Sequence, residues 1–149
     1  MKNNYFFKKR FSNIFKRASK KSEVTSQILY GEKFIILSKS KKWIKIKSLF
    51  DNYMGYIENK DYVTEHNPKY KIYSLKANIY NKDNKKIKTF LPFGSQIEEI
   101  YKKKNYIEFE KNKWIKRKDI KIINHKEKNF NRIFKLFLNT KYVWGGKTF

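Results

Sequence analysis

Side chains able to do covalent or acid-base chemistry are few in this sequence. Among 149 residues there is no cysteine, and the only histidines are His66 and His125. Both lie in polar stretches between regions of regular hydrophobic pattern, so we interpret them as surface residues. The 13 Asp and Glu residues are scattered, without the spacing of a general acid-base pair or of a metal site. The sequence therefore predicts no catalytic residue, no metal ion and no cofactor.

A glycine pair near the carboxyl end stands in a more specific context. Residues 137–149 read Phe-Leu-Asn-Thr-Lys-Tyr-Val-Trp-Gly-Gly-Lys-Thr-Phe. Gly145 and Gly146 lack the glycine-rich surroundings of a phosphate-binding loop, so we assign them to a turn. The phrase F-L-x-T-x-Y-x-W-G-G-x-T resembles the approach to the nucleophile in NlpC/p60-type cysteine peptidases.

This resemblance implies a catalytic centre that the sequence approaches without containing it. In the family the phrase leads into Asp-Cys-Ser-Gly, whose Cys attacks the peptide bond. Because no Cys is present, we expect an amino-terminal portion of such an enzyme, truncated before the nucleophile and inactive alone. The resemblance assigns Tyr142, Trp144, Gly145 and Gly146 to the entrance of the absent catalytic site. Lys141 departs from the family, which usually has Pro there.

Two copies of one unit precede this segment. Gly31 lies 12 positions before Trp43, and Gly94 lies 12 positions before Tyr106. The motif Asn-Ile-Phe at residues 13–15 corresponds to Asn-Ile-Tyr at 78–80, and Trp-Ile-Lys-Ile at 43–46 corresponds to Tyr-Ile-Glu-Phe at 106–109. The matched spacing indicates an internal repeat.

Within each copy the hydrophobic residues alternate with polar ones, which predicts short strands. The clearest strands of the first copy are expected at 12–16, 33–37, 43–46 and 55–57. We expect Gly31 and Gly94 to take a positive backbone φ at the turns before strands, because glycine has no Cβ penalty there. The first copy is 5 residues longer between Trp43 and Tyr56 than the second is between Tyr106 and Trp114, which predicts a longer hairpin loop at 48–53.

The two copies resemble the bacterial SH3 domain. Its marks are the Asn-Ile-aromatic opening, Leu-Tyr-Gly-Glu at 29–32, the Trp-Ile-Lys-Ile hairpin, Gly-Tyr-Ile at 55–57 and Lys-Asp-Tyr-Val at 60–63. We therefore expect a mainly β chain with three parts. They are a first SH3-like barrel at 5–65, a second at 70–123, and the start of an α+β papain-like peptidase domain at 128–149.

One short helix is expected at the start of the third part. Phe130, Ile133, Phe134, Phe137 and Leu138 follow the i, i+3, i+4, i+7, i+8 spacing of an amphipathic helix over 129–138. Asn129 is a candidate cap. So short a helix needs a core to lie on, and we expect its apolar face to be partly exposed or folded back on the barrels.

The resemblance also implies a role for the barrels in substrate selection. In related cytoplasmic murein-peptide endopeptidases, the SH3-like units narrow one end of the catalytic cleft and favour short peptides with a free amino end. Phe50, Tyr53 and Tyr56, near the long hairpin, are the candidate gating residues here. Packing within the barrel or loop is an equally good interpretation of all three. Trp43 and Trp114 occupy matching positions in both copies, and we expect them in the cores.

The net charge of +24 raises the question of a polyanionic partner. Lysine supplies 33 of the 37 basic residues, whereas specific phosphate or base recognition favours arginine. We interpret the charge as a solvated surface and expect no specific nucleic acid partner. No stretch is long and apolar enough to span a membrane or resembles a signal peptide, which predicts a cytoplasmic protein.

Three functions remain open at this stage. The first is the substrate-gating region of a murein-peptide cysteine endopeptidase, whose partner is a short murein-derived peptide bound by the complete enzyme. The second is a stand-alone tandem SH3-like module that binds cell-wall peptides or another anionic partner. The third is RNA binding through the lysine-rich surface, with Tyr53 and Tyr106 available for base stacking.

Overall fold

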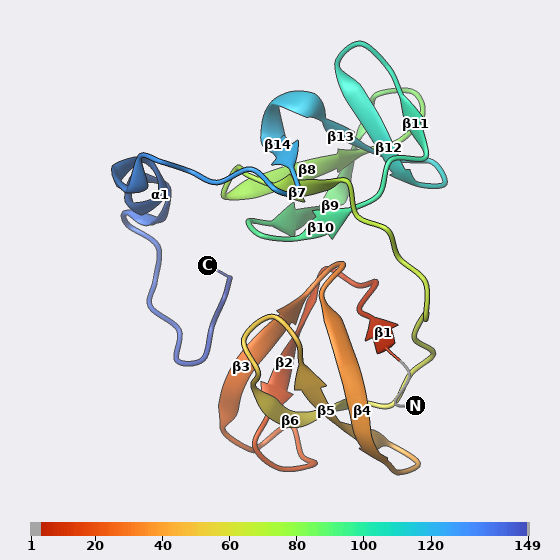
Figure 1. The fold of residues 1–149 in the computed structure, drawn as a ribbon, viewed down its shortest axis with the longest axis vertical. Coiled ribbons are helices and arrows are strands. Elements are labelled where there is room, and N and C mark those ends of the chain that lie inside the picture. Colours follow the sequence, from red (N-terminus) through yellow and green to blue (C-terminus); the bar gives the residue numbers. More distant parts are fainter. Residues whose placement is uncertain (1–3, 149) are drawn as a thin grey trace. The chain divides into compact units, whose positions relative to one another are not determined.

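A computed structural model describes residues 4–148, which form two compact units. The first unit holds the chain up to residue 66 together with the segment from 141 onward, and the second holds residues 67–140 (Figure 1). Phe149, the last residue of the expected peptidase segment, lies outside the described residues. The expected mainly β class is confirmed, because strands dominate both units and one short α-helix is present among the described residues.

The first unit is built on one antiparallel sheet of six strands. Their order across the sheet is β1-β4-β5-β6-β2-β3, so the hairpins β4-β5-β6 and β2-β3 are joined through β6 and β2. The strands are β1 (Asn4–Phe6), β2 (Phe11–Phe15), β3 (Val24–Leu29), β4 (Lys33–Lys39), β5 (Trp43–Ser48) and β6 (Met54–Glu58). This sheet curls around the core of the unit (Figure 1).

Alternation along the strands fills that core. On β5, Ile44 and Ile46 are fully buried, whereas Lys45 and Lys47 point away from them, as a period of two requires. Ile14, Ile28, Phe34 and Ile57 arrive from the neighbouring strands and complete one hydrophobic cluster with Phe7. A lysine-rich sequence therefore still folds, because lysine occupies mainly the outward positions.

The second unit repeats this plan with shorter strands in two sheets. A five-stranded sheet has the order β11-β12-β13-β8-β9, and a three-stranded sheet has the order β10-β7-β14. The strands are β7 (Tyr70–Ile72), β8 (Lys76–Tyr80), β9 (Lys86–Pro92), β10 (Gln96–Ile97), β11 (Tyr101–Lys102), β12 (Tyr106–Glu110), β13 (Lys113–Lys116) and β14 (Ile120–Ile122), with a 3₁₀ turn at Arg117–Asp119.

The internal repeat is confirmed in the backbone. Gly31 and Gly94 have φ of 83° and 85°, the positive values expected at matching turns. The expected difference in hairpin length is also present. Five residues, 49–53, join β5 to β6, whereas two residues, 111–112, join β12 to β13. Asn52 and Asn112, each with positive φ, turn the chain in the two loops.

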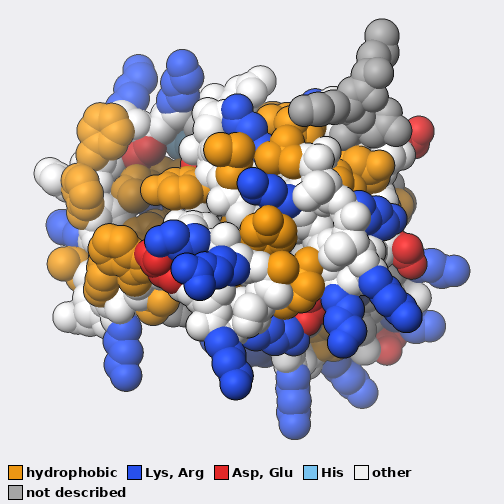
Figure 2. Space-filling view, turned by 90° about the horizontal axis from the view of Figure 1, so that it is seen from below, with side chains coloured by type: hydrophobic (Ala, Val, Ile, Leu, Met, Phe, Trp, Pro, Cys, Tyr) orange, Lys and Arg blue, Asp and Glu red, His pale blue; other side chains and the backbone are white. Residues whose placement is uncertain are grey.

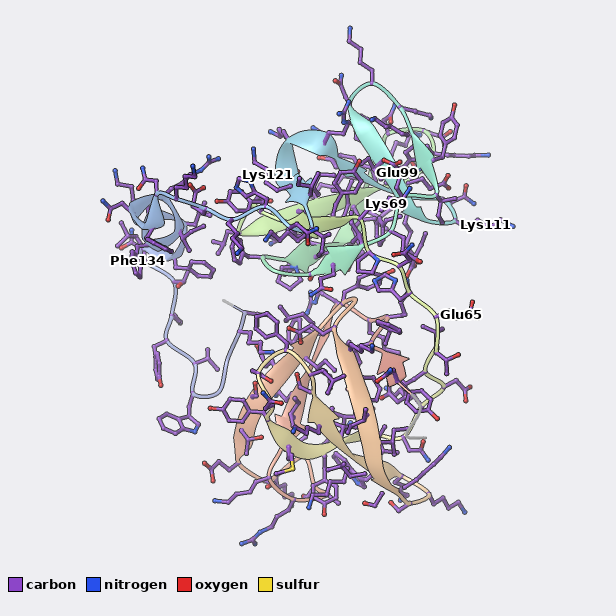
Figure 3. The ribbon with its side chains drawn as sticks, in the orientation of Figure 1. Glu65, Lys69, Glu99, Lys111, Lys121 and Phe134 are labelled. Carbon is purple, nitrogen blue, oxygen red and sulfur yellow. The ribbon has the colours of Figure 1, made fainter. Side chains whose placement is uncertain are left out.

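The helix α1 (Phe130–Phe137) belongs to the second unit. Asn129 occupies the cap position but makes no side-chain capping hydrogen bond. One residue of the apolar face, Phe137, packs edge-on against Phe93 with ring centroids 5.4 Å apart. Phe130 and Phe134 are each 69% exposed, and Phe134 projects from the helix in Figure 3. The apolar face of the helix is thus partly packed on the second unit and partly exposed, as expected from the shortness of the helix.

Two expectations about single residues are wrong. His66 is buried rather than on the surface, because the rings of Phe6 and Tyr30 pack edge-on against it and the Lys8 ammonium lies 3.1 Å from its Nδ1. Trp114 is buried as expected, but Trp43 is only half-buried, at the outer end of β5. The burial of His66 could not be predicted from its polar neighbours in the sequence, because it results from contacts with residues far away in the chain.

A buried glycine gives a test of the close packing between β6 and β2. A Cβ on Gly55 would lie 2.5 Å from the carbonyl oxygen of Phe15 and 2.6 Å from Cγ2 of Ile14. We expect Gly55→Ala to destabilise the first unit by about 3 kcal/mol in urea denaturation, because rigid backbone cannot yield. The corresponding Lys113 of the second copy is exposed, so Lys113→Ala is the control and should change stability by less than about 0.5 kcal/mol. Equal effects of the two changes would contradict this view of the packing.

An ion triad on β6 gives a pH-dependent prediction. Glu58 lies 2.5 Å from the Lys20 ammonium and 2.6 Å from that of Lys60, and hydrogen bonds from these lysines lower the pKa of Glu58 to about 2. A lowered folded-state pKa means that the stabilisation is present above about pH 4.5 and is lost as the pH falls toward 2. The two lysines are exposed and Glu58 is partly exposed, so the gain is below about 1 kcal/mol.

The measurement is the unfolding free energy of wild type and Glu58→Gln between pH 7 and pH 2. The variant should be less stable at pH 7, and the difference should vanish at the acid end. Glu65→Gln, at an exposed carboxylate outside the triad (Figure 3), is the matched control and should follow the wild-type curve. A constant offset between wild type and Glu58→Gln at every pH would refute the assignment.

Candidate functional site

The segment that carries Trp-Gly-Gly lies along strand β3 of the first unit (Figure 1). Gly146 donates its N–H to the carbonyl of Val143 at 2.9 Å, which closes a turn, so the assignment of the glycine pair to a turn is confirmed. Gly145 has φ of 67°, and a Cβ there would lie 2.7 Å from the carbonyl oxygen of Val24. The glycine is therefore required both by the backbone angle and by the contact with β3.

The next two residues are held by the side chain of Gln27, on β3. Its Oε1 accepts hydrogen bonds from the N–H of Lys147 at 2.8 Å, from the N–H of Thr148 at 2.9 Å and from the Thr148 hydroxyl at 3.0 Å. Its Nε2 donates to Oδ1 of Asn13 at 2.9 Å, which orients the amide. Gln27 is 5% exposed, so these bonds form away from bulk water.

The Lys147 side chain enters an acidic site of the same unit. Its ammonium lies 3.2 Å from both carboxylate oxygens of Glu32 and 2.8 Å from Oδ2 of Asp51. It also lies 4.7 Å from the ring centroid of Phe50, within the range of a cation–π contact. Ser26 donates its hydroxyl to Asp51 at 3.1 Å, and the N–H of Leu29 donates to Glu32 at 2.9 Å.

The two carboxylates differ in their electrostatic environments. Glu32 is 2% exposed, and burial raises its pKa although Lys147 and the N–H of Leu29 oppose the rise. Burial also acts to raise the pKa of Asp51, but hydrogen bonds from Lys147 and Ser48 outweigh it, so the net pKa lies below the usual value. One ammonium thus serves a deeply buried carboxylate and a partly buried one.

A surface pocket of about 300 Å³ adjoins the docked segment. Its lining comprises Glu23 and Thr25 of the β3 side, Tyr53 of the long hairpin loop, and Tyr142, Trp144 and Gly145 of the segment. Tyr53 is 50% exposed, Trp144 66% and Tyr142 83%, so aromatic surface is available to a ligand. The structure brings one candidate gating residue together with three residues assigned to the catalytic entrance.

The other candidate residues lie in different places. Phe50 is 68% exposed and contacts the Lys147 ammonium, and Gly146 closes the turn with Val143 and is not among the residues that line the pocket. Tyr56 lies on β6, paired with Phe15 of β2 and with the Lys45 ammonium 5.9 Å from its ring centroid. It is therefore part of the sheet surface and does not line the pocket.

Sequence reasoning missed Gln27, Glu32, Asp51 and Lys147 as one site. Glu32 was visible only as the last letter of Leu-Tyr-Gly-Glu, and Lys147 stood among 33 lysines. The available signal was the repeat itself: the long loop that carries Asp51 is absent from the second copy, and an insertion in one of two copies marks a region under different constraint.

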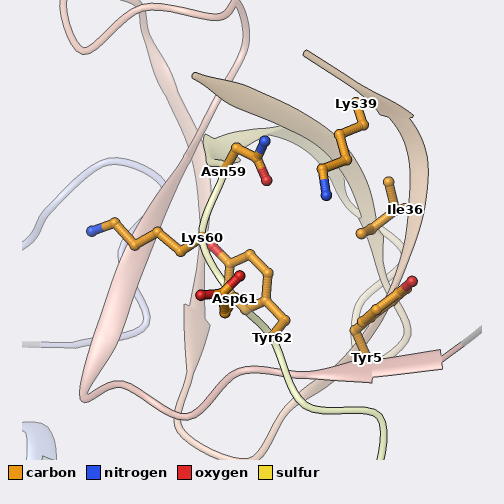
Figure 4. A pocket seen from close by; sticks show the side chains of 7 residues that line it. All are labelled: Tyr5, Ile36, Lys39, Asn59, Lys60, Asp61 and Tyr62. Carbon is orange, nitrogen blue, oxygen red and sulfur yellow. The ribbon is translucent and has the colours of Figure 1, made fainter. Parts of the chain in front are cut away.

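A second pocket on the first unit has a volume of about 420 Å³ and contains none of the segment's residues (Figure 4). Tyr5, Ile36 and Tyr62 line it together with the polar side chains of Lys39, Asn59, Lys60 and Asp61. Burial raises the pKa of Tyr62 to about 12, and its hydroxyl donates to the carbonyl of Glu58 at 2.6 Å, which makes this tyrosine a structural residue.

The described residues were also considered for a basic patch, a metal-binding cluster and a membrane-spanning helix. Lys and Arg side chains are spread among apolar ones on the face shown in Figure 2 rather than gathered in one patch. Within residues 4–148, no three His, Asp or Glu side chains are grouped to hold a metal ion. Across the same residues, no helix has the length and apolar character needed to cross a bilayer.

Comparison with known proteins places these observations in a family context. Residues 14–61 match the family model of the bacterial dipeptidyl-peptidase SH3 domain. A search of curated proteins gave no significant match. The chain is also similar in structure to an NlpC/P60 family protein from Bacillus cereus, with a TM-score of 0.75 and 12% sequence identity. The similarity covers 97% of this chain and 66% of that protein, so the chain spans about two thirds of the solved structure.

These findings agree with the interpretation drawn from the motifs. Residues 14–61 of the first unit are similar to the bacterial dipeptidyl-peptidase SH3 domain, and the fold of the chain is similar to that of about two thirds of a solved NlpC/P60 family protein.

Gly145 provides a test of the segment's position. In Gly145→Ala the methyl group would clash with β3 and the φ of 67° would be strained, so the segment should leave β3. We expect amide hydrogen exchange at Lys147 and Thr148 to accelerate on the order of tenfold or more, as in local opening. Val143→Ala, at a half-exposed side chain of the same segment, should leave exchange unchanged. Unaltered exchange in Gly145→Ala would show that the segment is not seated on β3.

Proposed function

We propose that this chain is the substrate-gating region of a murein-peptide cysteine endopeptidase of the NlpC/P60 type. One observation carries the proposal: the Trp-Gly-Gly segment, which resembles the approach to the catalytic Cys, is docked on the first SH3 domain beside Tyr53 and Phe50. A catalytic centre that continues from this segment would have the long hairpin loop of the SH3 domain as one wall of its cleft.

The division of labour in such an enzyme follows from the residues present. The nucleophile would come from the Asp-Cys-Ser-Gly phrase of the family, since this sequence has no Cys. Tyr53, Tyr142 and Trp144 offer aromatic surface against which a short peptide would pack, at a surface pocket of about 300 Å³. A wall built of rigid aromatic rings selects by shape, which suits a gate that admits short peptides with a free amino end. The family resemblance implies a cytoplasmic setting for this work.

Two other functions compete with this proposal. A tandem SH3-like module that binds cell-wall peptides without catalysis would use the same aromatic pocket, and it differs in having no catalytic partner domain. RNA binding would use the lysine side chains, which are spread over the viewed face and interspersed with apolar groups. A phosphate-driven contact would weaken steeply with salt.

Peptide titration followed by NMR separates these functions. We expect a short murein tripeptide to shift the signals of Tyr53, Tyr142 and Trp144, and the N-acetylated tripeptide to bind less tightly because its terminal ammonium is gone. Tyr53→Ala should weaken binding on the order of fivefold to tenfold, as loss of one aromatic contact does. Tyr101→Ala, at a similarly exposed tyrosine of the second unit, is the control.

Each outcome bears on the proposal. Peptide shifts confined to the pocket would support gating. Absence of peptide binding, or binding that Tyr53→Ala leaves intact, would overturn it. A salt-sensitive response to a single-stranded RNA, with shifts over the lysine surface, would favour the RNA-binding alternative instead.

A further inference from the structure

We propose that the first SH3 domain contains a docking site for a lysine-threonine segment of its own chain, and that Lys147 is the residue that locks the segment in place. The site is formed by Gln27, Glu32 and Asp51. This inference goes beyond the proposed function, because it concerns how the segment is held on the SH3 domain, whichever ligand the neighbouring pocket takes.

The Lys147 ammonium balances the negative charge of an ionised Glu32 carboxylate. Glu32 is 2% exposed, and Lys147 supplies the one ammonium that the described residues place within 4 Å of it. Removing one partner of a buried ion pair is strongly destabilising, since the remaining charge has lost its water and gained nothing. Lys147 itself is 17% exposed, and its ammonium is shared with Asp51 at 2.8 Å. The pair therefore specifies a lysine at this point of the segment.

Gln27 recognises the backbone and the next side chain. Three donors of Lys147 and Thr148 converge on its Oε1 at 2.8 to 3.0 Å, and one of these is the threonine hydroxyl. Because its Nε2 already donates to Asn13, the amide is fixed with the oxygen toward the segment. The site therefore favours a residue with a side-chain hydroxyl directly after the lysine.

The second SH3 copy serves as an internal control for this interpretation. Gln27 pairs with Asn13 across β2 and β3, and the corresponding Asn78 pairs with Phe90 across β8 and β9. Glu32 follows Gly31, whereas Ser95 follows Gly94. The loop that carries Asp51 has five residues, and its counterpart in the second copy has two.

The same barrel therefore folds with Phe and Ser in place of the Gln and Glu, and with no counterpart of the Asp. Barrel stability does not require the three polar residues. Their presence in the copy that contacts Lys147, and their replacement in the other, indicates that they serve the docking of the segment.

Hydrogen exchange on the full chain tests the lock. We expect Lys147→Met to accelerate exchange of the Lys147 and Thr148 amides on the order of tenfold or more, because local opening no longer breaks an ion pair. Amides of Ile44 and Ile46 in the barrel should exchange as in wild type. Lys141→Met, at an exposed lysine of the same segment, is the matched control and should leave all of these rates unchanged.

A coupling measurement distinguishes a lock from general loosening. Glu32→Gln should accelerate segment exchange in the wild-type background and have little further effect when combined with Lys147→Met, since the two residues act as one pair. Lys147→Arg, which keeps the charge, should retain more protection than Lys147→Met. This variant also keeps the test informative if Lys147→Met disturbs the barrel.

The proposal is overturned if the wild-type segment amides exchange at unprotected rates, if Lys147→Met leaves them protected, or if the effects of Glu32→Gln and Lys147→Met simply add. None of these results depends on peptide binding by the neighbouring pocket. Failure of the docking site and failure of the proposed function can therefore be told apart.

Discussion

The structure depends first on the burial of alternate residues in two very small barrels. A unit of this size closes only if its short strands all direct apolar side chains to one centre, as Ile14, Ile44, Ile46 and Ile57 do in the first copy. That requirement leaves little freedom in the strands and much in the loops and outward positions. The chain accommodates a net charge of +24 because lysine occupies mainly the positions that the barrels do not use.

Both copies direct apolar side chains from short strands into one core, but they differ in their loops and in a few polar residues. Both keep the glycine turns at Gly31 and Gly94, with nearly equal φ. Only the first has the five-residue hairpin loop and the buried carboxylate of Glu32. Duplication of a stable framework followed by change in its loops is a way to create a binding surface without risk to the core, because loop residues contribute little to closure.

Charge burial gives the docked segment its specificity. An exposed lysine on this surface would contribute little, since water competes with every partner. Lys147 differs because Glu32 is buried, so that loss of the ammonium would leave the carboxylate without a partner of opposite charge and away from water. The Trp-Gly-Gly turn is placed beside Tyr53 as a consequence of this contact and of the tight approach of Gly145 to β3.

Much of the fold could be predicted from the sequence, because it rests on local and periodic signals. Alternation in β5, the paired 12-residue spacings, the glycine turns, the longer hairpin and the amphipathic helix all follow from residues close together in the chain. The candidate site could be predicted only in part. Tyr53 and Trp144 were identified separately, from a loop and a motif, but their meeting in one pocket joins residues far apart in sequence.

The sequence by itself determined that two similar β units precede a Trp-Gly-Gly segment, since hydrophobic period and repeat spacing are properties of the chain alone. Only the tertiary structure decided that His66 is buried, that Trp43 is only half-buried, and that Lys147 pairs with Glu32. The physical reason is that burial and ion pairing are set by what the folded chain brings close. A lysine has the same composition and charge wherever it stands, and only its surroundings give it a partner.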